Sequence, residues 1–251
     1  MSGHSKWKTI KRQKGANDAK RGQAFTKLSK VITLAVKQGG GISEPEKNFK
    51  LRLAIEAARA VNMPKDTIDR AIERAAGKNQ SEMAEVLYEG FGPGGISIMV
   101  EAITDNKQRT TPEVKSLFDK NGGVMGNPGA VAYQFQQLGQ IVLAHPAQTL
   151  DEIFLLAAEN GAEDVIQEGG DIIVYTKPED VEKVRQGLLA QRLTISDASI
   201  IRKPLLTKEV VTKEEAEKIL SFLERLEDHD DVQNVFSNLS ISDEVSRTLE
   251  I

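Results

Sequence analysis

The sequence predicts a multidomain α+β protein: a basic N-terminal three-helix domain is followed by two α/β domains, one ferredoxin-like (β-α-β-β-α-β) and inserted into the other. Charge is the first observation, since residues 1–78 hold 18 Lys and Arg against 7 Asp and Glu, while the whole chain has a net charge of −4. Apolar spacing is the second, because it changes from helical to alternating after residue 78. The predicted limits are 1–78, 79–130 with 204–251, and 131–203.

The helical domain begins with an arm, residues 2–15, which lacks any apolar period. A helix is expected from Asn17 to the triplet Gly39–Gly41, which ends it because glycine adopts left-handed conformations freely. A second helix is expected over 45–61, with Pro45 near its first turn. Its apolar positions, Phe49 among them, predict a broad buried face.

A third helix is expected from Pro64 to Gly77, since proline suits a first turn and disfavours helix before it. Beyond residue 78, alternating side chains predict strands over 85–90 and 96–102, joined by a turn at Phe91–Gly95. A helix is expected over 111–120, with Pro112 in its first turn. The C-terminal part predicts a strand at 209–211, a helix at 212–227 with a capping-box-like Thr212–Glu215, and a strand at 232–237.

Residues 131–203 predict a complete four-stranded unit. Its elements are expected in the order strand, helix, strand, strand, helix, strand, over 133–143, 150–160, 163–168, 171–175, 178–191 and 195–202. This order is that of the ferredoxin-like fold, a four-stranded antiparallel sheet with helices on one face.

The sequence contains few residues that could act in catalysis or bind a metal ion. The chain has no cysteine, and His4, His145 and His229 are scattered without partners at metal or triad spacing, so each is expected at the surface. Phe91–Gly95 joins two strands and lacks a following Gly-Lys-Ser/Thr, so it is a turn and not a phosphate-binding loop. The acids at 227–231 are expected to form a solvated helix end. We therefore predict no catalytic residue, metal, cofactor or small-molecule substrate, and a protein that is not an enzyme.

No run of apolar residues approaches the roughly 20 that span a membrane, and the basic N-terminus is not followed by an apolar signal region. The expected location is cytoplasmic, without membrane association, and the expected state is a monomer.

The basic N-terminal segment predicts a nucleic-acid partner, because Lys and Arg neutralise phosphates and release their counterions. Trp7 offers a face on which a base can stack; docking on the helical domain is the alternative. The predicted contacts are Lys6, Trp7, Lys8, Lys11, Arg12, Lys14, Lys20, Arg21, Lys27 and Lys30. Local helix capping explains most of the loop Asn62–Asp66 between the second and third helices, but Met63, if exposed, would suit an adaptable contact.

Several motifs together resemble the YebC/PmpR family over nearly the whole chain: Gly3–Trp7, Asp18–Gly22, Phe25–Leu28, Asn62–Asp66, Tyr88–Gly95 and Asp231–Val235. The resemblance implies the three-domain fold described above and a non-enzymatic, cytoplasmic regulator of gene expression. It also makes the loop Asn62, Met63, Pro64 and Lys65 a candidate contact.

The sequence does not decide whether the nucleic-acid partner is DNA or RNA. Bacterial members of this family are generally described as DNA-binding transcriptional regulators, whereas its mitochondrial translational activator and some bacterial members resemble ribosome-associated translation factors. The helices lack an obvious helix-turn-helix turn, which favours RNA or the ribosome. A third alternative is a protein-binding adaptor that uses the two α/β sheets.

Overall fold

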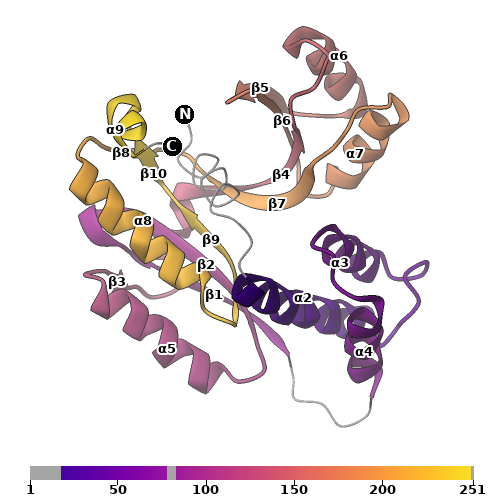
Figure 1. Cartoon of the computed structure of the whole chain (residues 1–251), viewed down its shortest axis with the longest axis horizontal. Coiled ribbons are helices and arrows are strands. Elements are labelled where there is room, and N and C mark those ends of the chain that lie inside the picture. Colours follow the sequence, from indigo (N-terminus) through magenta and orange to yellow (C-terminus); the bar gives the residue numbers. More distant parts are fainter. Residues whose placement is uncertain (1–17, 78–82, 250–251) are drawn as a thin grey trace. The chain divides into compact units, whose positions relative to one another are not determined.

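The computed structural model describes residues 18–77 and 83–249 (Figure 1). The chain divides into two compact units: residues 133–207 form one, and the described residues before and after them form the other. The second unit holds two separate apolar clusters, one in its helical segment and one in its α/β segment. The fold class is the mixed α+β class that the sequence predicts, whereas the limits of three domains stay predictions.

The helical segment consists of α2 (Asp18–Gln38), α3 (Phe49–Ala60) and α4 (Lys65–Ala76). Both α3 and α4 pack on α2. Ile32, Val36, Leu51 and Ala58 lie fully buried among these helices. The apolar stripe of α2 thus provides the surface on which the two shorter helices assemble.

The start of α3 differs from the prediction, because Pro45 lies in a turn and the helix begins only at Phe49. Asn48 is the N-cap: its Oδ1 accepts the Leu51 N–H at 3.1 Å. Its Nδ2 donates to Ala35 O at 2.9 Å and to Ile42 O at 3.1 Å. These contacts with α2 and the preceding turn fix the helix start at Asn48, and they leave Phe49 41% exposed instead of buried.

The α/β segment is built on a four-stranded antiparallel sheet in the order β3-β1-β2-β9. Its strands are β1 (Ala84–Phe91), β2 (Ser97–Thr104), β3 (Val124–Met125) and β9 (Val232–Ser237). Helices α5 (Lys107–Lys120) and α8 (Lys213–Glu227) pack on one face (Figure 1). Phe118 of α5 and Phe222 of α8 meet edge to face there, with ring centroids 5.2 Å apart.

One helix start in this segment was predicted wrongly, and one predicted capping box does not form. Helix α5 begins four residues early, because the Asn106 side chain caps it by accepting the Arg109 N–H at 3.1 Å, so Pro112 lies inside the helix. Thr212 precedes α8 but makes no side-chain cap bond. The Glu215 carboxylate lies beside Gly94 in the 3-10 turn Pro93–Gly95, which joins β1 to β2.

Short strands and a short helix, most of them not predicted from the sequence, complete the segment. Strand β8 (Lys208–Val210) pairs in parallel with β10 (Leu239–Ile241), and α9 (Asp243–Thr248) follows. The sequence did not predict β3, β10 or α9, each of which is too short to show a periodic pattern.

Residues 133–207 form the predicted β-α-β-β-α-β unit. Its elements are β4 (Phe135–Leu143), α6 (Leu150–Asn160), β5 (Asp164–Glu168), β6 (Asp171–Thr176), α7 (Val181–Ala190) and β7 (Asp197–Pro204). The strands are antiparallel in the order β5-β6-β4-β7. Ile141, Val174, Ile153 and Val184 share the core between this sheet and its two helices, as the ferredoxin-like prediction required.

Candidate nucleic-acid interface

Most of the predicted contacts precede the described residues. Lys6, Trp7, Lys8, Lys11, Arg12 and Lys14 lie outside the described part of the chain, and for Lys20 only the helical backbone is described. Arg21 is exposed on α2. The role of these residues in binding nucleic acid therefore stays a prediction.

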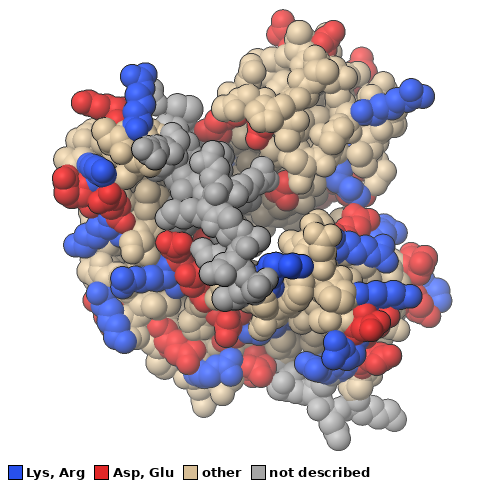
Figure 2. Space-filling view, viewed as in Figure 1, with Lys and Arg blue, Asp and Glu red and all other residues tan. Residues whose placement is uncertain are grey.

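The helical segment presents further cations at its surface. Residues 21–77 contain 11 Lys and Arg against 6 Asp and Glu. Figure 2 shows these basic side chains interspersed with acidic ones over the helices. The exposed cations are Arg21, Lys47, Lys50, Arg52, Arg59, Lys65, Arg70 and Arg74. The net positive charge of the segment therefore reaches the surface; the acidic side chains of residues 21–77 all lie beyond α2, because residues 21–38 contain four Lys and Arg and no Asp or Glu.

Lys27 and Lys30 instead contact the corner between α8 and β9. Lys27 Nζ donates to Glu227 O, and Lys30 Nζ donates to Asp230 O at 2.8 Å and to the Asp231 carboxylate. Carbonyls at the end of a helix lack partners within it and carry partial negative charge, so an ammonium group is stabilising there. In the described structure these two ammonium groups join α2 to the α/β segment. Their predicted contact with nucleic acid is untested.

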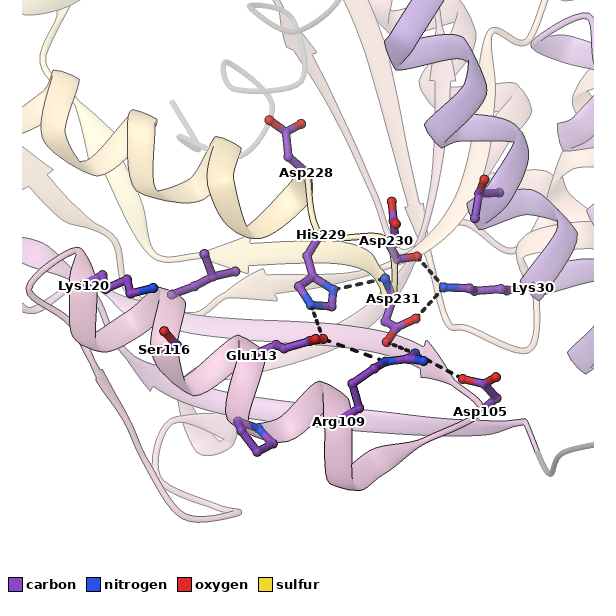
Figure 3. A pocket seen from close by; sticks show the side chains of 13 residues that line it. Lys30, Asp105, Arg109, Glu113, Ser116, Lys120, Asp228, His229, Asp230 and Asp231 are labelled. Carbon is purple, nitrogen blue, oxygen red and sulfur yellow. Dashed lines mark hydrogen bonds and ion pairs between the residues drawn. The ribbon is translucent and has the colours of Figure 1, made fainter.

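Asp231 is the centre of this corner (Figure 3). Its side chain is 2% exposed, and its carboxylate accepts the Thr110 hydroxyl at 2.5 Å and the Arg109 guanidinium at 2.9 Å, in addition to Lys30. Burial alone would raise the pKa of this carboxyl group. The hydrogen bonds from Lys30, Thr110 and Arg109 outweigh burial and hold the pKa well below its usual range. Asp231 is therefore an ionised, buried anchor, and its predicted place in a solvated acidic helix end is wrong.

His229 also differs from its prediction as a surface residue, because its side chain is only 15% exposed. Its Nδ1 accepts the Asp231 N–H at 3.1 Å, and its Nε2 lies 3.1 Å from Glu113 Oε2. With Nδ1 acting as acceptor, the neutral ring carries its proton on Nε2 and donates it to Glu113. His145 is exposed, as predicted.

These side chains line an open groove of about 860 Å³ between α2, α5 and the α8–β9 corner. Arg109 contacts Asp105 at 3.1 Å and Glu113 at 3.9 Å as well as Asp231. The charged groups at the floor of the groove are thus paired with one another, which is typical of a structural ion-pair network. In the described ranges, no three His, Asp or Glu side chains converge to hold a metal ion.

The candidate loop is only partly available to a partner. Met63 is 5% exposed and belongs to the helical core, whereas Asn62, Pro64 and Lys65 are exposed. Asn62 has φ 59°, a left-handed conformation that asparagine tolerates, and it turns the chain from α3 into α4. A contact through this loop, which stays a prediction, would use these three residues.

Sequence reasoning missed the roles of Arg109, Thr110 and Glu89. Glu89 is 5% exposed, and its carboxylate accepts the N–H groups of Gly129, Val131 and Ala132, each at 2.8 Å. Arg109 and Thr110 meet Asp231 across more than 120 positions. No local sequence pattern predicts contacts between residues so far apart in the chain. The one available signal was that Glu89 and Asp231 lie within the motifs that resemble the family.

Comparison with known proteins supports the same family throughout the chain. The family models described as "TACO1/YebC protein N-terminal domain" and "TACO1/YebC second and third domain" match residues 5–78 and 83–239. A probable transcriptional regulatory protein of Acidithiobacillus ferrooxidans is 50% identical over 251 residues, covering 100% of this chain and 99% of the relative. One from Chloroflexus aggregans is 48% identical over 250 residues, covering 98% of each.

A solved structure is also similar. The crystal structure of a conserved hypothetical protein from Aquifex aeolicus matches with a TM-score of 0.81 at 41% identity, covering 90% of this chain and 93% of that chain. In the ranges that the structure describes, no helix is both long and apolar enough to cross a bilayer. The resemblance predicted from the sequence motifs is confirmed: the chain belongs to the TACO1/YebC family.

Proposed function

We propose that this chain is a non-enzymatic regulator of gene expression that binds nucleic acid through its basic N-terminal helical domain. The observation that carries the proposal is the separation of charge: residues 1–78 have 11 more bases than acids, within a chain whose net charge is −4. A basic module joined to an acidic body binds a polyanion through one end, while the other end repels it.

The relatives are named probable transcriptional regulatory proteins, which supports transcription regulation as the first candidate role, and DNA is the partner proposed for that role. The cytoplasm is the corresponding proposed location. Phosphate contacts from the arm, Lys6 to Lys14, and from Arg21 would position the domain on its target. No step of chemistry is required of the protein, and the mutually paired groups around Asp231 are consistent with a structural role.

A second candidate is an RNA-binding, ribosome-associated translation factor, and one observation favours it. Helices α3 and α4 each pack on α2, and a groove of about 420 Å³ lined by Ile55, Arg59, Ile68 and Ile72 separates them. They contact α2 more extensively than they contact each other, and the turn between them contains Pro64, so the pair differs from the usual helix-turn-helix arrangement whose second helix enters the major groove. Recognition of RNA does not require such a pair.

The test compares the full-length protein with Lys11/Arg12/Lys14→Glu. Binding to a duplex DNA and to a ribosomal RNA fragment is measured across salt concentrations, and co-migration with ribosomes is followed in sucrose gradients at low and high salt. The exposed triple variant Lys177/Lys183/Lys218→Glu changes the charge equally on the acidic body and serves as the control. The arm variant should lower the slope of log K against log salt by roughly 2–3, because each lost phosphate contact removes about 0.7–0.9.

The partner is decided by the same experiment. Binding to a promoter-containing duplex at near-physiological salt without ribosome co-migration supports the transcriptional regulator, whereas the reverse supports the translation factor. If the arm variant and the control bind both nucleic acids as tightly as the wild type, the proposal fails and a protein-binding adaptor becomes the better interpretation.

A further inference from the structure

We propose that Phe49, together with Arg52 and Lys50, forms a binding site for one unpaired nucleotide, whose base stacks on the Phe49 ring while its phosphate contacts the two cations. This inference rests on the proposed function, since it names where the helical domain reads a nucleic acid outside the N-terminal arm. It also specifies the form of that nucleic acid, because a stacked base must be free of its duplex.

The ring of Phe49 is unusually placed for the first residue of a helix. It is 41% exposed, whereas Leu51, Ala54, Ile55 and Ala58 on the core side of α3 are at most 6% exposed. Burying an exposed aromatic ring against another flat, apolar surface is favourable, and a nucleobase provides such a surface with little sequence preference. The exposed part of the ring is therefore free surface that the helical core does not use.

One cation lies over the ring, and a second follows the ring in the chain. The guanidinium carbon of Arg52 lies 5.4 Å from the centre of the Phe49 ring, within the range of a cation–π contact. Lys50 Nζ donates to Gln38 Oε1 at 2.6 Å, and this partner is a neutral amide, so the contact does not cancel the lysine charge. The first turn of α3 contains no acidic side chain that would repel a phosphate.

The turn before α3 is held in place. Gly40 and Gly41 adopt left-handed conformations in it, with φ of 70° and 84°. The Asn48 side chain, held by Ala35 O and Ile42 O, fixes the turn against α2. The ring and its cations therefore project from a fixed corner, and such a prearranged site loses less entropy on binding.

Phe154 is also exposed, but its charged neighbours differ from those of Phe49. It is 49% exposed on α6, but its helix begins with Asp151 and Glu152 in the first turn and has no basic residue in the last. A phosphate beside Phe154 would meet carboxylates, so this ring is not expected to bind a nucleotide. The two phenylalanines make a matched pair: both are exposed on helices of similar length, in opposite charge environments.

The experiment measures the affinity of the full-length protein for a fluorescent single-stranded oligouridylate of about 12 nucleotides and for the same length of RNA duplex. Phe49→Ala should weaken single-strand binding by about 5- to 150-fold, the loss of one base–aromatic stack, with an unchanged salt slope. Duplex binding should change little. Phe49→Tyr keeps a stacking ring and should restore affinity, which excludes misfolding as the cause, and Phe154→Ala should bind as the wild type does.

The cations are tested through their salt dependence. Arg52→Ala should weaken single-strand binding and lower the salt slope by about 0.7, because one phosphate contact is lost. Ultraviolet cross-linking of a 4-thiouridine oligonucleotide should place a cross-linked peptide over residues 47–59 in the wild type but not in Phe49→Ala.

Two results with Phe49→Ala overturn the inference, and a third, with the wild type, overturns the proposed function on which it rests. If Phe49→Ala and Phe154→Ala bind the single strand equally well, Phe49 does not stack on a base, although the proposed function still holds as long as the wild type binds. If Phe49→Ala loses ribosome co-migration but keeps its oligonucleotide affinity, the exposed ring contacts a protein. If the wild type binds neither of these RNAs nor the duplex DNA of the first experiment, the proposed function itself fails.

Discussion

Replacing Asp231 with Asn removes the charge on which α2, α5 and the α8–β9 corner converge. The amide retains the size of the side chain and one acceptor oxygen. Its NH2 group, however, is a donor that faces the donors of Lys30, Arg109 and Thr110. At least one of these three groups then loses its bond to Asp231 and keeps only its second acceptor, which is Asp230 O for Lys30, Asp105 for Arg109 and Asn106 O for Thr110.

The size of the effect follows from the exposure of the partners. Removing one member of a fully buried ion pair costs about 3–5 kcal/mol. Here the Lys30 side chain is 17% exposed and that of Arg109 is 46% exposed, and Arg109 keeps Asp105 as an alternative partner. Solvent therefore compensates part of the loss, and we expect Asp231→Asn to lower the free energy of unfolding by about 2–4 kcal/mol.

Urea denaturation combined with hydrogen exchange measures this loss locally. Amides of α5 and β9 should exchange faster in Asp231→Asn, while amides of α6 in the 133–207 unit should not. Asp230→Asn is the matched control, because that side chain is exposed and only its backbone carbonyl meets Lys30. Its effect should stay within about 0.5 kcal/mol. Lys30→Ala should also cost less in the Asp231→Asn background than in the wild type.

The pH dependence of stability provides an independent check, and its direction follows from the pKa of Asp231. The folded pKa of Asp231 is held below its unfolded value, which is about 3.9, so the native state releases this proton more readily. The resulting stability is present above about pH 4 and is lost as the pH falls toward the folded pKa. The difference between wild type and Asp231→Asn should therefore shrink below about pH 4. Equal stability of the two proteins at pH 7, or a difference that is independent of pH, would refute the reasoning.

Three other substitutions are testable by thermal denaturation. Glu89→Gln should destabilise by about 1.5–3 kcal/mol, because the carboxylate that accepts three backbone N–H groups of residues 129–132 becomes a neutral amide; equal melting temperatures would contradict this. Asn48→Ala should cost about 1–2 kcal/mol through its lost cap, and hydrogen exchange should localise the effect to α3. Gly94→Ala should cost about 1–2 kcal/mol because φ is 68° and Glu215 occupies the space, whereas helical Gly22→Ala, with open space around it, should not destabilise.

Strongly periodic elements were predictable from sequence. The limits of α6, Leu150–Asn160, were predicted correctly, because a clear apolar stripe coincides with an effective start signal. A capping box does occur there, at Thr149 and Glu152, and not at Thr212 and Glu215, which have the same spacing. Spacing alone cannot separate the two cases, because it does not indicate that the Glu215 side chain lies beside Gly94, a residue distant in sequence.

The candidate site was predictable only in its charge. The sum of Lys and Arg indicates a basic domain, but it does not separate cations that face solvent from those that contact protein. Lys30 lies in the same basic helix as Arg21, yet its partner is Asp231, some 200 residues later. Periodicity likewise placed Phe49 on a buried face, although the helix starts at this residue and its ring lies at the edge of the core.

The insertion of residues 133–207 between β3 and β8 also sets an order of events during synthesis. A ribosome adds about 5–20 residues per second, so roughly 8–30 s separate the completion of α4 from the appearance of Asp231. Throughout that interval α2 to α4 can assemble their own core, but Lys27 and Lys30 have no α8–β9 corner to contact and β2 lacks its neighbour β9. The nascent chain thus presents Lys27 and Lys30 without their contacts at the α8–β9 corner while it is still attached to a ribosome.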